Sequence, residues 1–305
     1  MAERQAAVGK ALLFPALFVV LWSTGFIAAK YGLPYAPPFK FLFYRFALVA
    51  ILMSLVVLAT RPPWPRTLRD YANVALVALL VHALYLGGVF VAIDGGMTAG
   101  TSAMLVGLQP LLTVFLAYVW MSERVTFRQW AGLGLGLAGV YFVLRHKVNF
   151  GGDLAGILPC ALALVGISVG TLYQKRYCAH IDLRSGSVVQ FAVCALVYAP
   201  LALIVEARPV EWAAPFLFAL GWSVIVLSVG AISLLYWLLR HGAAAGVASL
   251  FYLVPPVTAL QAWLFFGETL DFLAIAGMML IAFGVALARP GKSSATREDA
   301  VAPVP

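Results

Sequence analysis

The chain has 305 residues, of which 63% are hydrophobic and only 10% are charged, with a mean hydropathy of +0.98 and a net charge of +8. Charged residues normally make up about a quarter of a soluble domain, so folding alone cannot shield this much apolar surface from water. The composition therefore excludes a soluble globular protein and predicts an all-α membrane protein that crosses the bilayer many times.

Apolar stretches of roughly 20 residues, the length that crosses the hydrocarbon core, recur along the whole chain. Separated by charged and Pro/Gly-rich breaks, they predict ten transmembrane helices, over residues 11–30, 39–60, 71–93, 98–120, 127–145, 154–175, 186–205, 213–239, 243–266 and 271–288. Thr126 and Gln129 form a predicted capping box at the start of the fifth helix. Two tails lie outside these spans, residues 1–10 and residues 290–305, and we expect the second to be disordered.

Lys and Arg residues predict the orientation of the spans. With a cytoplasmic amino terminus, the outside segments hold only Lys30, Lys40, Arg145, Lys147 and Arg208, and every other basic residue except Arg45 lies in an inside segment. Because cytoplasmic loops are enriched in Lys and Arg, both termini are predicted to be cytoplasmic. The net positive charge then marks a membrane face with anionic lipids, and no nucleic-acid partner is needed to explain it.

The two halves of the chain align at a single shift of 145 positions. This shift places Pro110, Thr113, Glu123, Gly132 and Gly139 on Pro255, Thr258, Glu268, Gly277 and Gly284, and Ser23, Gly25 and Lys30 on Ser168, Gly170 and Lys175. Each half holds five spans, an odd number, so the halves, residues 11–148 and 149–289, are predicted to be inverted repeats. Inverted repeats are typical of secondary transporters, in which they open a central site to either side in turn.

Three sequence patterns stand out: Leu21-Trp22-Ser23-Thr24-Gly25-Phe26, Tyr44-Arg45-Phe46, and the doubled Pro…Glu…Gly pattern of Pro110, Glu123 and Gly132 with Pro255, Glu268 and Gly277. Together they resemble the EamA family of the drug/metabolite transporter superfamily. The resemblance implies a ten-helix carrier in the bacterial cytoplasmic membrane, with a central cavity between the repeats and no cofactor. It also implies export of small metabolites, most often amino acids including aromatic ones. Sugars or cationic drugs, or a channel-like pathway, are the alternatives.

Prolines within the fourth and ninth spans, Pro110, Pro255 and Pro256, each remove a backbone hydrogen bond near mid-membrane. Carbonyls left free at that depth are tolerated against protein or a wet cavity, so these kinks are predicted to face the substrate path. Kinks that merely improve packing are the alternative. Gln109, beside the first kink, is either a substrate ligand or a partner for the carbonyl of Val106.

Several polar and aromatic side chains inside the spans are candidate substrate contacts. His82 and Tyr85 lie one turn apart, and a histidine inside a membrane is a functional candidate, although it also forms hydrogen bonds between helices. The other candidates are Trp22, Ser23, Ser168 and Tyr252. The serines have a competing role, because serine in a membrane helix often bonds its own backbone.

Three charged residues are candidates for gating or structure. The side chain of Arg45 either extends to the membrane interface or forms a binding site for a carboxylate in the cavity wall. Glu123 and Glu268 end their helices on opposite membrane faces and are predicted to stabilise helix termini, with gating as the alternative. No Asp or Glu lies at mid-depth in any span, which favours gradient-driven export over proton coupling.

An intramembrane enzyme would need a nucleophile with a base, or clustered metal ligands. His82, His146, His180 and His241 are scattered, and no HExxH or GxSxG pattern is present. We therefore predict no catalytic activity, no metal site and no cofactor. The expected partners are a small-molecule substrate and the lipid bilayer, and the expected assembly is a monomer or a weak homo-oligomer.

Overall fold

The computed structural model describes residues 2–121, 126–145, 154–231, 234, 237–238, 250–268 and 272–287, and within these residues all regular structure is helical. The helices of the first half are α1 (Ala2–Gly32), α2 (Pro38–Thr60), α3 (Leu68–Val77), the π-helix η1 (Ala78–Leu84), α4 (Tyr85–Asp94), α5 (Ala99–Val106), α6 (Gln109–Met121) and α7 (Phe127–Arg145). Those of the second half are α8 (Leu154–Tyr177), α9 (Leu183–Pro200), the π-helices η2 (Leu201–Val205) and η3 (Trp222–Ala231), α10 (Ala214–Gly221), the 3₁₀ turn η4 (Phe251–Leu253), α13 (Val254–Phe266) and α14 (Phe272–Leu287).

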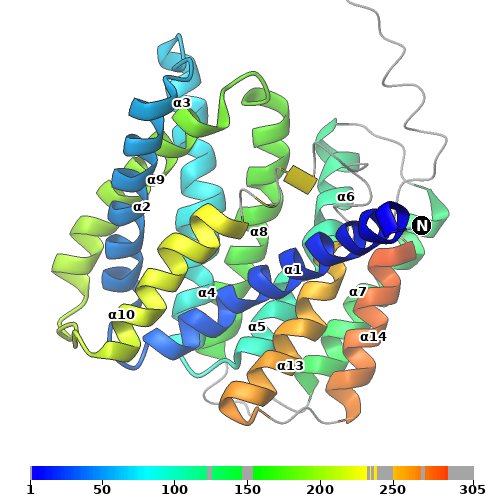
Figure 1. Ribbon diagram of the computed structural model, residues 1–305. Helices are drawn as coiled ribbons and strands as arrows, with labels where there is room; N and C mark the ends of the chain where they lie inside the picture. Colours follow the sequence, from blue (N-terminus) through cyan, green and yellow to red (C-terminus); the bar gives the residue numbers. More distant parts are fainter. Residues whose placement is uncertain are drawn as a thin grey trace, which may run out of the picture.

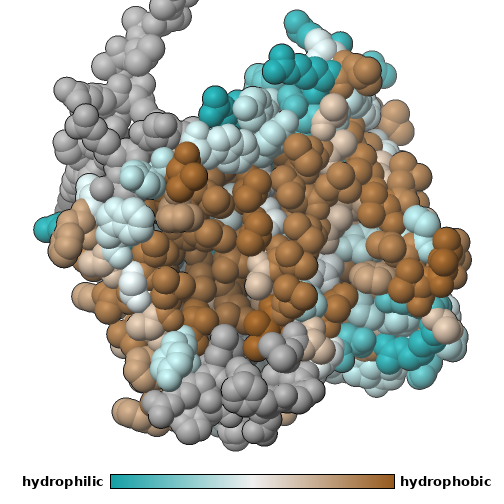
Figure 2. Space-filling view, turned by 180° about the vertical axis from the view of Figure 1, so that it is seen from behind, coloured by the Kyte–Doolittle hydropathy of each residue, from teal (hydrophilic) through white to brown (hydrophobic). Residues whose placement is uncertain are grey.

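Seven helical segments in the described part of the chain are long and apolar enough to cross a membrane. A broad band of apolar side chains lies across the molecule, with polar side chains gathered above and below it (Figure 2). The predicted all-helical membrane class is therefore confirmed. The number of ten spans and the side of the termini stay predictions, because parts of the eighth and ninth spans lie outside the described residues. Most of the predicted amino-terminal tail is helical, since α1 begins at Ala2.

Side-chain caps explain where several helices begin. The predicted capping box opens α7: the Thr126 amide donates to Gln129 Oε1 at 2.8 Å, and the Gln129 amide donates to Thr126 Oγ1 at 3.4 Å. Asp182 caps α9 by accepting from the Arg184 amide at 2.9 Å, so this helix begins three residues before the predicted start. The side-chain hydrogen bond from Arg184 also holds the pKa of the Asp182 carboxyl below its usual value.

Helix packing between the halves follows the shift of 145 positions. α7 packs along α14, and α2 packs along α9, each a pair of counterparts at that shift (Figure 1). The other contacts between the halves include two matched couples: η1 packs on α8 as η3 packs on α1, and α6 packs on α8 as α13 packs on α1. Exchanging the halves maps these pairs onto one another, as expected for two structurally equivalent repeats.

Glycines allow α7 and α14 to pack backbone against backbone. A Cβ atom added at Gly139 would lie 2.6 Å from the carbonyl oxygen of Gly277, and one added at Gly284 would lie 2.5 Å from that of Gly132. These two contacts are counterparts at the same shift. The glycine-rich face of the fifth span therefore serves close helix packing within the chain.

The predicted kinks at the prolines are interruptions of the helices. α5 ends at Val106 and α6 begins at Gln109, one residue before Pro110. In the second half, η4 precedes α13, and Pro255 occupies its first turn. A proline fits the first turn of a helix because its missing N–H would have no partner there. Both halves thus depart from regular α-helix just before the corresponding prolines.

Candidate functional site

A cavity of about 530 Å³ lies between the two halves. Its walls come from α1, α2, η1, α4 and α6 of the first half, and from α8, α9, η3 and η4 of the second. This volume is within the range of small-molecule sites. The segments beside the prolines of both halves contribute, through Gln109 and Pro110 on one side and Phe251 and Tyr252 on the other.

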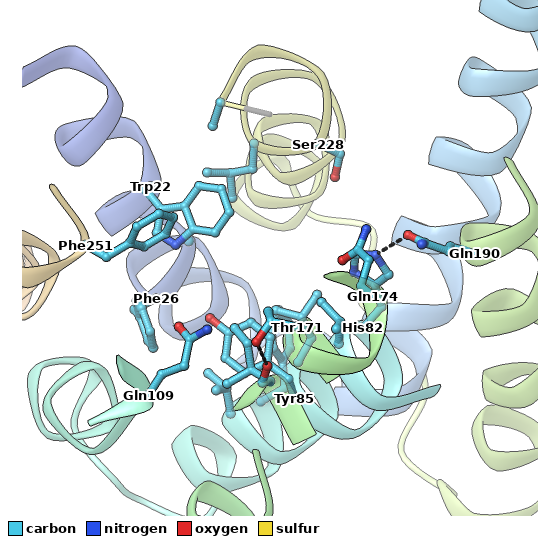
Figure 3. Close-up of a pocket in the computed structure, with 18 of the residues that line it drawn as sticks. Trp22, Phe26, His82, Tyr85, Gln109, Thr171, Gln174, Gln190, Ser228 and Phe251 are labelled. Atoms are coloured by element: carbon cyan, nitrogen blue, oxygen red, sulfur yellow. Dashed lines mark hydrogen bonds between the residues drawn. The ribbon is translucent and has the colours of Figure 1, made fainter. Parts of the chain in front are cut away.

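One wall of the cavity is aromatic. Trp22 and Phe26 of α1 lie beside Phe251 of η4 on the same side of the cavity (Figure 3). The rings of Trp22 and Phe251 meet edge to face with centroids 5.2 Å apart, and the buried Phe18 supports both at 5.3 Å. The wall can therefore hold an apolar or aromatic group.

The opposite wall carries amides and hydroxyls. His82 Nε2–H donates to Gln190 Oε1 at 3.0 Å, and Gln174 and Thr171 lie beside this pair (Figure 3). His82 belongs to the π-helix η1, and such irregular turns often occur at functional sites. His82 and Gln190 stand 108 positions apart in the sequence, so the polar wall forms only when η1 packs on α9.

Tyr198 holds this part of η1 in place. Its hydroxyl donates to the carbonyl of Ala83 at 2.7 Å, and its ring stacks on Phe46 with centroids 5.7 Å apart. Gly87 leaves room for the hydroxyl, because a Cβ atom at this position would overlap Tyr198 Oη.

We expect Gly87→Ala to lower the free energy of unfolding by about 1–3 kcal/mol through overpacking against Tyr198. Tyr198→Phe alone should cost about 1 kcal/mol, the net value of its hydrogen bond. The double variant should be more stable than the sum of the two single effects predicts, because the phenylalanine ring lacks the overlapping oxygen. Melting temperatures of the three variants in detergent measure this coupling, and strictly additive shifts would contradict the contact.

Most of the predicted site residues meet at this cavity. Trp22, His82, Tyr85, Gln109 and Tyr252 line it, as do Pro110 and Arg45. The amide of Gln109 makes no hydrogen bond to another described residue and faces the cavity (Figure 3), so it does not bond the carbonyl of Val106. Arg45 is only 8% exposed and lies at the cavity wall, which is not the position of a snorkelling side chain.

The structure does not bring Ser23 and Ser168 to the cavity. Both are fully buried: Ser23 donates to the carbonyl of Val254 at 3.3 Å, and Ser168 donates to that of Leu164 at 2.7 Å. Pro255 and Pro256 line a void of about 10 Å³ next to Tyr252. A small hydroxyl in a close-packed helix interface finds a backbone carbonyl more readily than open space.

Gln174, Gln190, Ser228 and Phe251 also line the cavity but were not predicted as site residues. The repeat offered a signal for Gln190, which is the counterpart of Arg45 at the shift of 145 positions. For Gln174, Ser228 and Phe251 no local pattern distinguished a cavity position from an ordinary helix position.

The cavity extends toward the ends of α8 and α9 that meet in the turn between them. Gln174 lies about one turn before the end of α8, and Ser187 about one turn after the start of α9. A further void of about 20 Å³ shares both residues and Gln190 with the cavity, and reaches Asp182 in the turn. This end of the bundle is the one predicted to be cytoplasmic.

At the opposite end of the helix bundle, the carboxyl end of α1 is held to its neighbours by close packing and by an ion pair. Ala28 and Ala29 are buried, and the next residue, Lys30, pairs with Glu268 after α13. Glu268 also accepts from the amides of Ala99 at 3.1 Å and Gly100 at 3.3 Å, at the start of α5. One carboxylate thus joins three helices. Its counterpart Glu123 lies outside the described residues.

No group of three or more potential metal ligands occurs among the described residues, and no Asp or Glu there lines the cavity. Cys160, Cys178 and Cys194 are buried and form no disulfide with one another.

An all-helical membrane fold with a central cavity between two matched halves is that of a membrane transporter. The chain belongs to the EamA-like transporter family, whose model matches residues 9–145 and, separately, residues 154–289. The resemblance seen in the sequence is therefore confirmed, and so is the multi-pass membrane location.

Three relatives align with nearly the whole chain. The uncharacterised transporter YvbV of Bacillus subtilis is 26% identical over 306 residues (98% of this chain, 97% of its own), and the uncharacterised inner membrane transporter YedA of Escherichia coli K12 is 26% identical over 294 residues (96% and 95%). A probable amino-acid metabolite efflux pump of Salmonella typhimurium is 28% identical over 286 residues (88% and 91%). A solved crystal structure matches with a TM-score of 0.64 at 19% identity, covering 92% of this chain and 97% of its own, which shows the fold alone.

Proposed function

We propose that this protein exports amino acids with apolar or aromatic side chains across the bacterial cytoplasmic membrane, by alternating access around the central cavity. The observation that carries the proposal is the division of the cavity into an aromatic wall, with Trp22 and Phe251, and a polar wall, with His82, Gln174 and Gln190. An amino acid has the same division between its side chain and its polar groups. The efflux-pump name of the Salmonella relative supports the same substrate class.

Alternating access is supported by two features. The two halves pack in matched pairs, and one end of the cavity approaches the surface while helices are held together at the other end. The cavity approaches the turn between α8 and α9, whereas Lys30 and Glu268 hold α1, α13 and α5 together at the opposite end. Exchange of the roles of the two halves would open the second end and close the first. Because no carboxylate lines the described cavity, we propose export down the substrate gradient without a carboxylate proton relay.

Cationic drugs fit this cavity poorly, because its described lining has a basic residue and no acidic one. Sugars remain the competing substrate class, since amides and aromatic rings bind them as well. We propose a monomer, or a weak homo-oligomer, as the transporting unit, because both halves of the cavity come from one chain.

Flux of labelled phenylalanine, glucose and a cationic dye in proteoliposomes tests the function. We expect saturable phenylalanine flux that is accelerated by substrate on the far side, and no flux of the dye. Trp22→Ala should raise the KM for phenylalanine about tenfold, because it removes the main aromatic contact. Trp64→Ala, on the exposed segment between α2 and α3, is the matched control and should leave KM unchanged. Conductance without saturation would instead indicate a channel, and flux of glucose alone would reassign the substrate.

A further inference from the structure

Arg45 places a positive charge in the wall of the cavity. It lies on α2, about 10 Å along the helix axis from Pro38, and the residue is 8% exposed. A guanidinium that reached water or lipid headgroups would be much more accessible. Among the described lining residues, Arg45 is the one permanently charged side chain.

No protein group in the described chain neutralises this charge. The ion pairs found there involve other basic residues, and Arg45 Nε is buried without a hydrogen-bond partner. His82 and Tyr85 lie near enough to interact with it electrostatically, but neither side chain is an anion at neutral pH. A buried cation without a counter-ion is strongly unfavourable, and an anion entering the cavity would relieve this.

The planar shape of the guanidinium and the single positive charge of the cavity indicate which class of anion would bind. A guanidinium presents a planar fork of donors that matches a carboxylate. Its counterpart in the second half is the neutral Gln190, so the cavity offers one positive charge, which suits a monoanion better than a phosphate dianion.

We propose that Arg45 binds the carboxylate of the transported substrate, so that the site takes monocarboxylates with an apolar or aromatic body. The body lies against Trp22 and Phe251, and the amides of Gln109 and Gln174 remain available for an amino group. This assignment rests on the proposed transport function, and it names the group of the substrate that the protein recognises.

Thermal-shift titrations of the purified full-length protein in detergent test the proposal with three probes that share one ring. 3-Phenylpropanoate carries the carboxylate, phenethylamine carries an ammonium instead, and phenyl phosphate carries a dianion. We expect 3-phenylpropanoate to bind at least about tenfold more tightly than the other two, as expected for charge-assisted hydrogen bonds.

Arg45→Gln, which introduces the residue found at the counterpart position, should weaken 3-phenylpropanoate binding about ten- to a hundredfold and should not weaken phenethylamine binding. Arg45→Lys keeps the charge without the fork and should give a smaller loss, and it serves if Arg45→Gln does not fold. Arg66→Gln, an exposed arginine between α2 and α3, removes the same charge outside the cavity and should bind like the wild type.

The proposal is overturned if the wild type does not bind 3-phenylpropanoate, if either Arg45 variant binds it as tightly as the wild type, or if phenethylamine or phenyl phosphate binds more tightly. Phenylalanine flux separates this result from the proposed function. Arg45-dependent binding without any flux would refute the transport of amino acids and leave the carboxylate site standing. Flux with an unchanged KM in Arg45→Gln would refute the carboxylate site and leave transport standing.

Discussion

Replacing Glu268 by alanine is expected to lower the free energy of unfolding by about 2–4 kcal/mol, because it removes one carboxylate from a cluster that joins three helices. The Glu268 side chain is 8% exposed and that of Lys30 is 30% exposed, so the substitution leaves a partly buried ammonium without its partner. It also leaves the amides of Ala99 and Gly100 at the start of α5 without their acceptor. The ring of Phe266, 4.9 Å from Lys30 Nζ, cannot replace these contacts.

The melting temperature of the purified protein measures this effect. Glu268→Gln retains one oxygen for the α5 amides and should lose less stability than Glu268→Ala. A matched comparison is Asp182→Ala, which removes a carboxylate whose described partners are all local, at the start of α9, and should cost only about 1 kcal/mol, as is usual for a lost N-cap. Equal melting temperatures of wild type and Glu268→Ala would show that the cluster does not hold these helices together.

Replacing Gly139 by valine is expected to separate α7 from α14 and to cost about 3 kcal/mol or more, above the usual range for overpacking because the obstruction is backbone. The first added atom would lie 2.6 Å from the Gly277 carbonyl oxygen and 2.8 Å from a side-chain carbon of Ile281. A carbonyl in the middle of α14 cannot move without breaking the hydrogen bonds of that helix.

Gly134 provides the control on the same helix, because a Cβ atom there would meet nothing within 4 Å. Gly134→Ala should be neutral or slightly stabilising, since alanine favours helix more than glycine does. Gly139→Ala should give an intermediate loss relative to valine. Melting temperatures and the yield of monodisperse protein compare the three variants. Similar behaviour of Gly134→Ala and Gly139→Ala would mean that the two helices are not in close contact.

Local sequence patterns predicted those helix starts that depend only on residues close together in the chain. The α7 capping box is an example, because Thr126 and Gln129 are three positions apart and satisfy each other without help from the rest of the fold. The interruptions before Pro110 and Pro255 were predicted only as kinks. Proline chemistry requires a disturbance there, but whether the helix bends or breaks depends on the neighbouring helices that take up the free backbone groups.

The candidate site could be predicted only in part. His82, Gln109 and Trp22 stood out because polar or amphipathic side chains at mid-membrane are unusual. Ser23 and Ser168 looked equally unusual, yet both are used in packing. Depth in the membrane can be read from sequence position, whereas the face that a helix turns toward the cavity depends on its rotation against its neighbours.

The sequence by itself determined the membrane class and the shift of 145 positions between the halves, because these rest on composition and on spacing along the chain, and its motifs carried the resemblance to the family. Only the tertiary structure decided which side chains meet. The packing of η1 on α9 brings His82 to Gln190, and the packing of α1 beside η4 sets Trp22 against Phe251. It also leaves Arg45 buried at the cavity wall without a counter-ion among the described residues. These pairs lie far apart in sequence and depend on how helices rotate and pack, which no local pattern records.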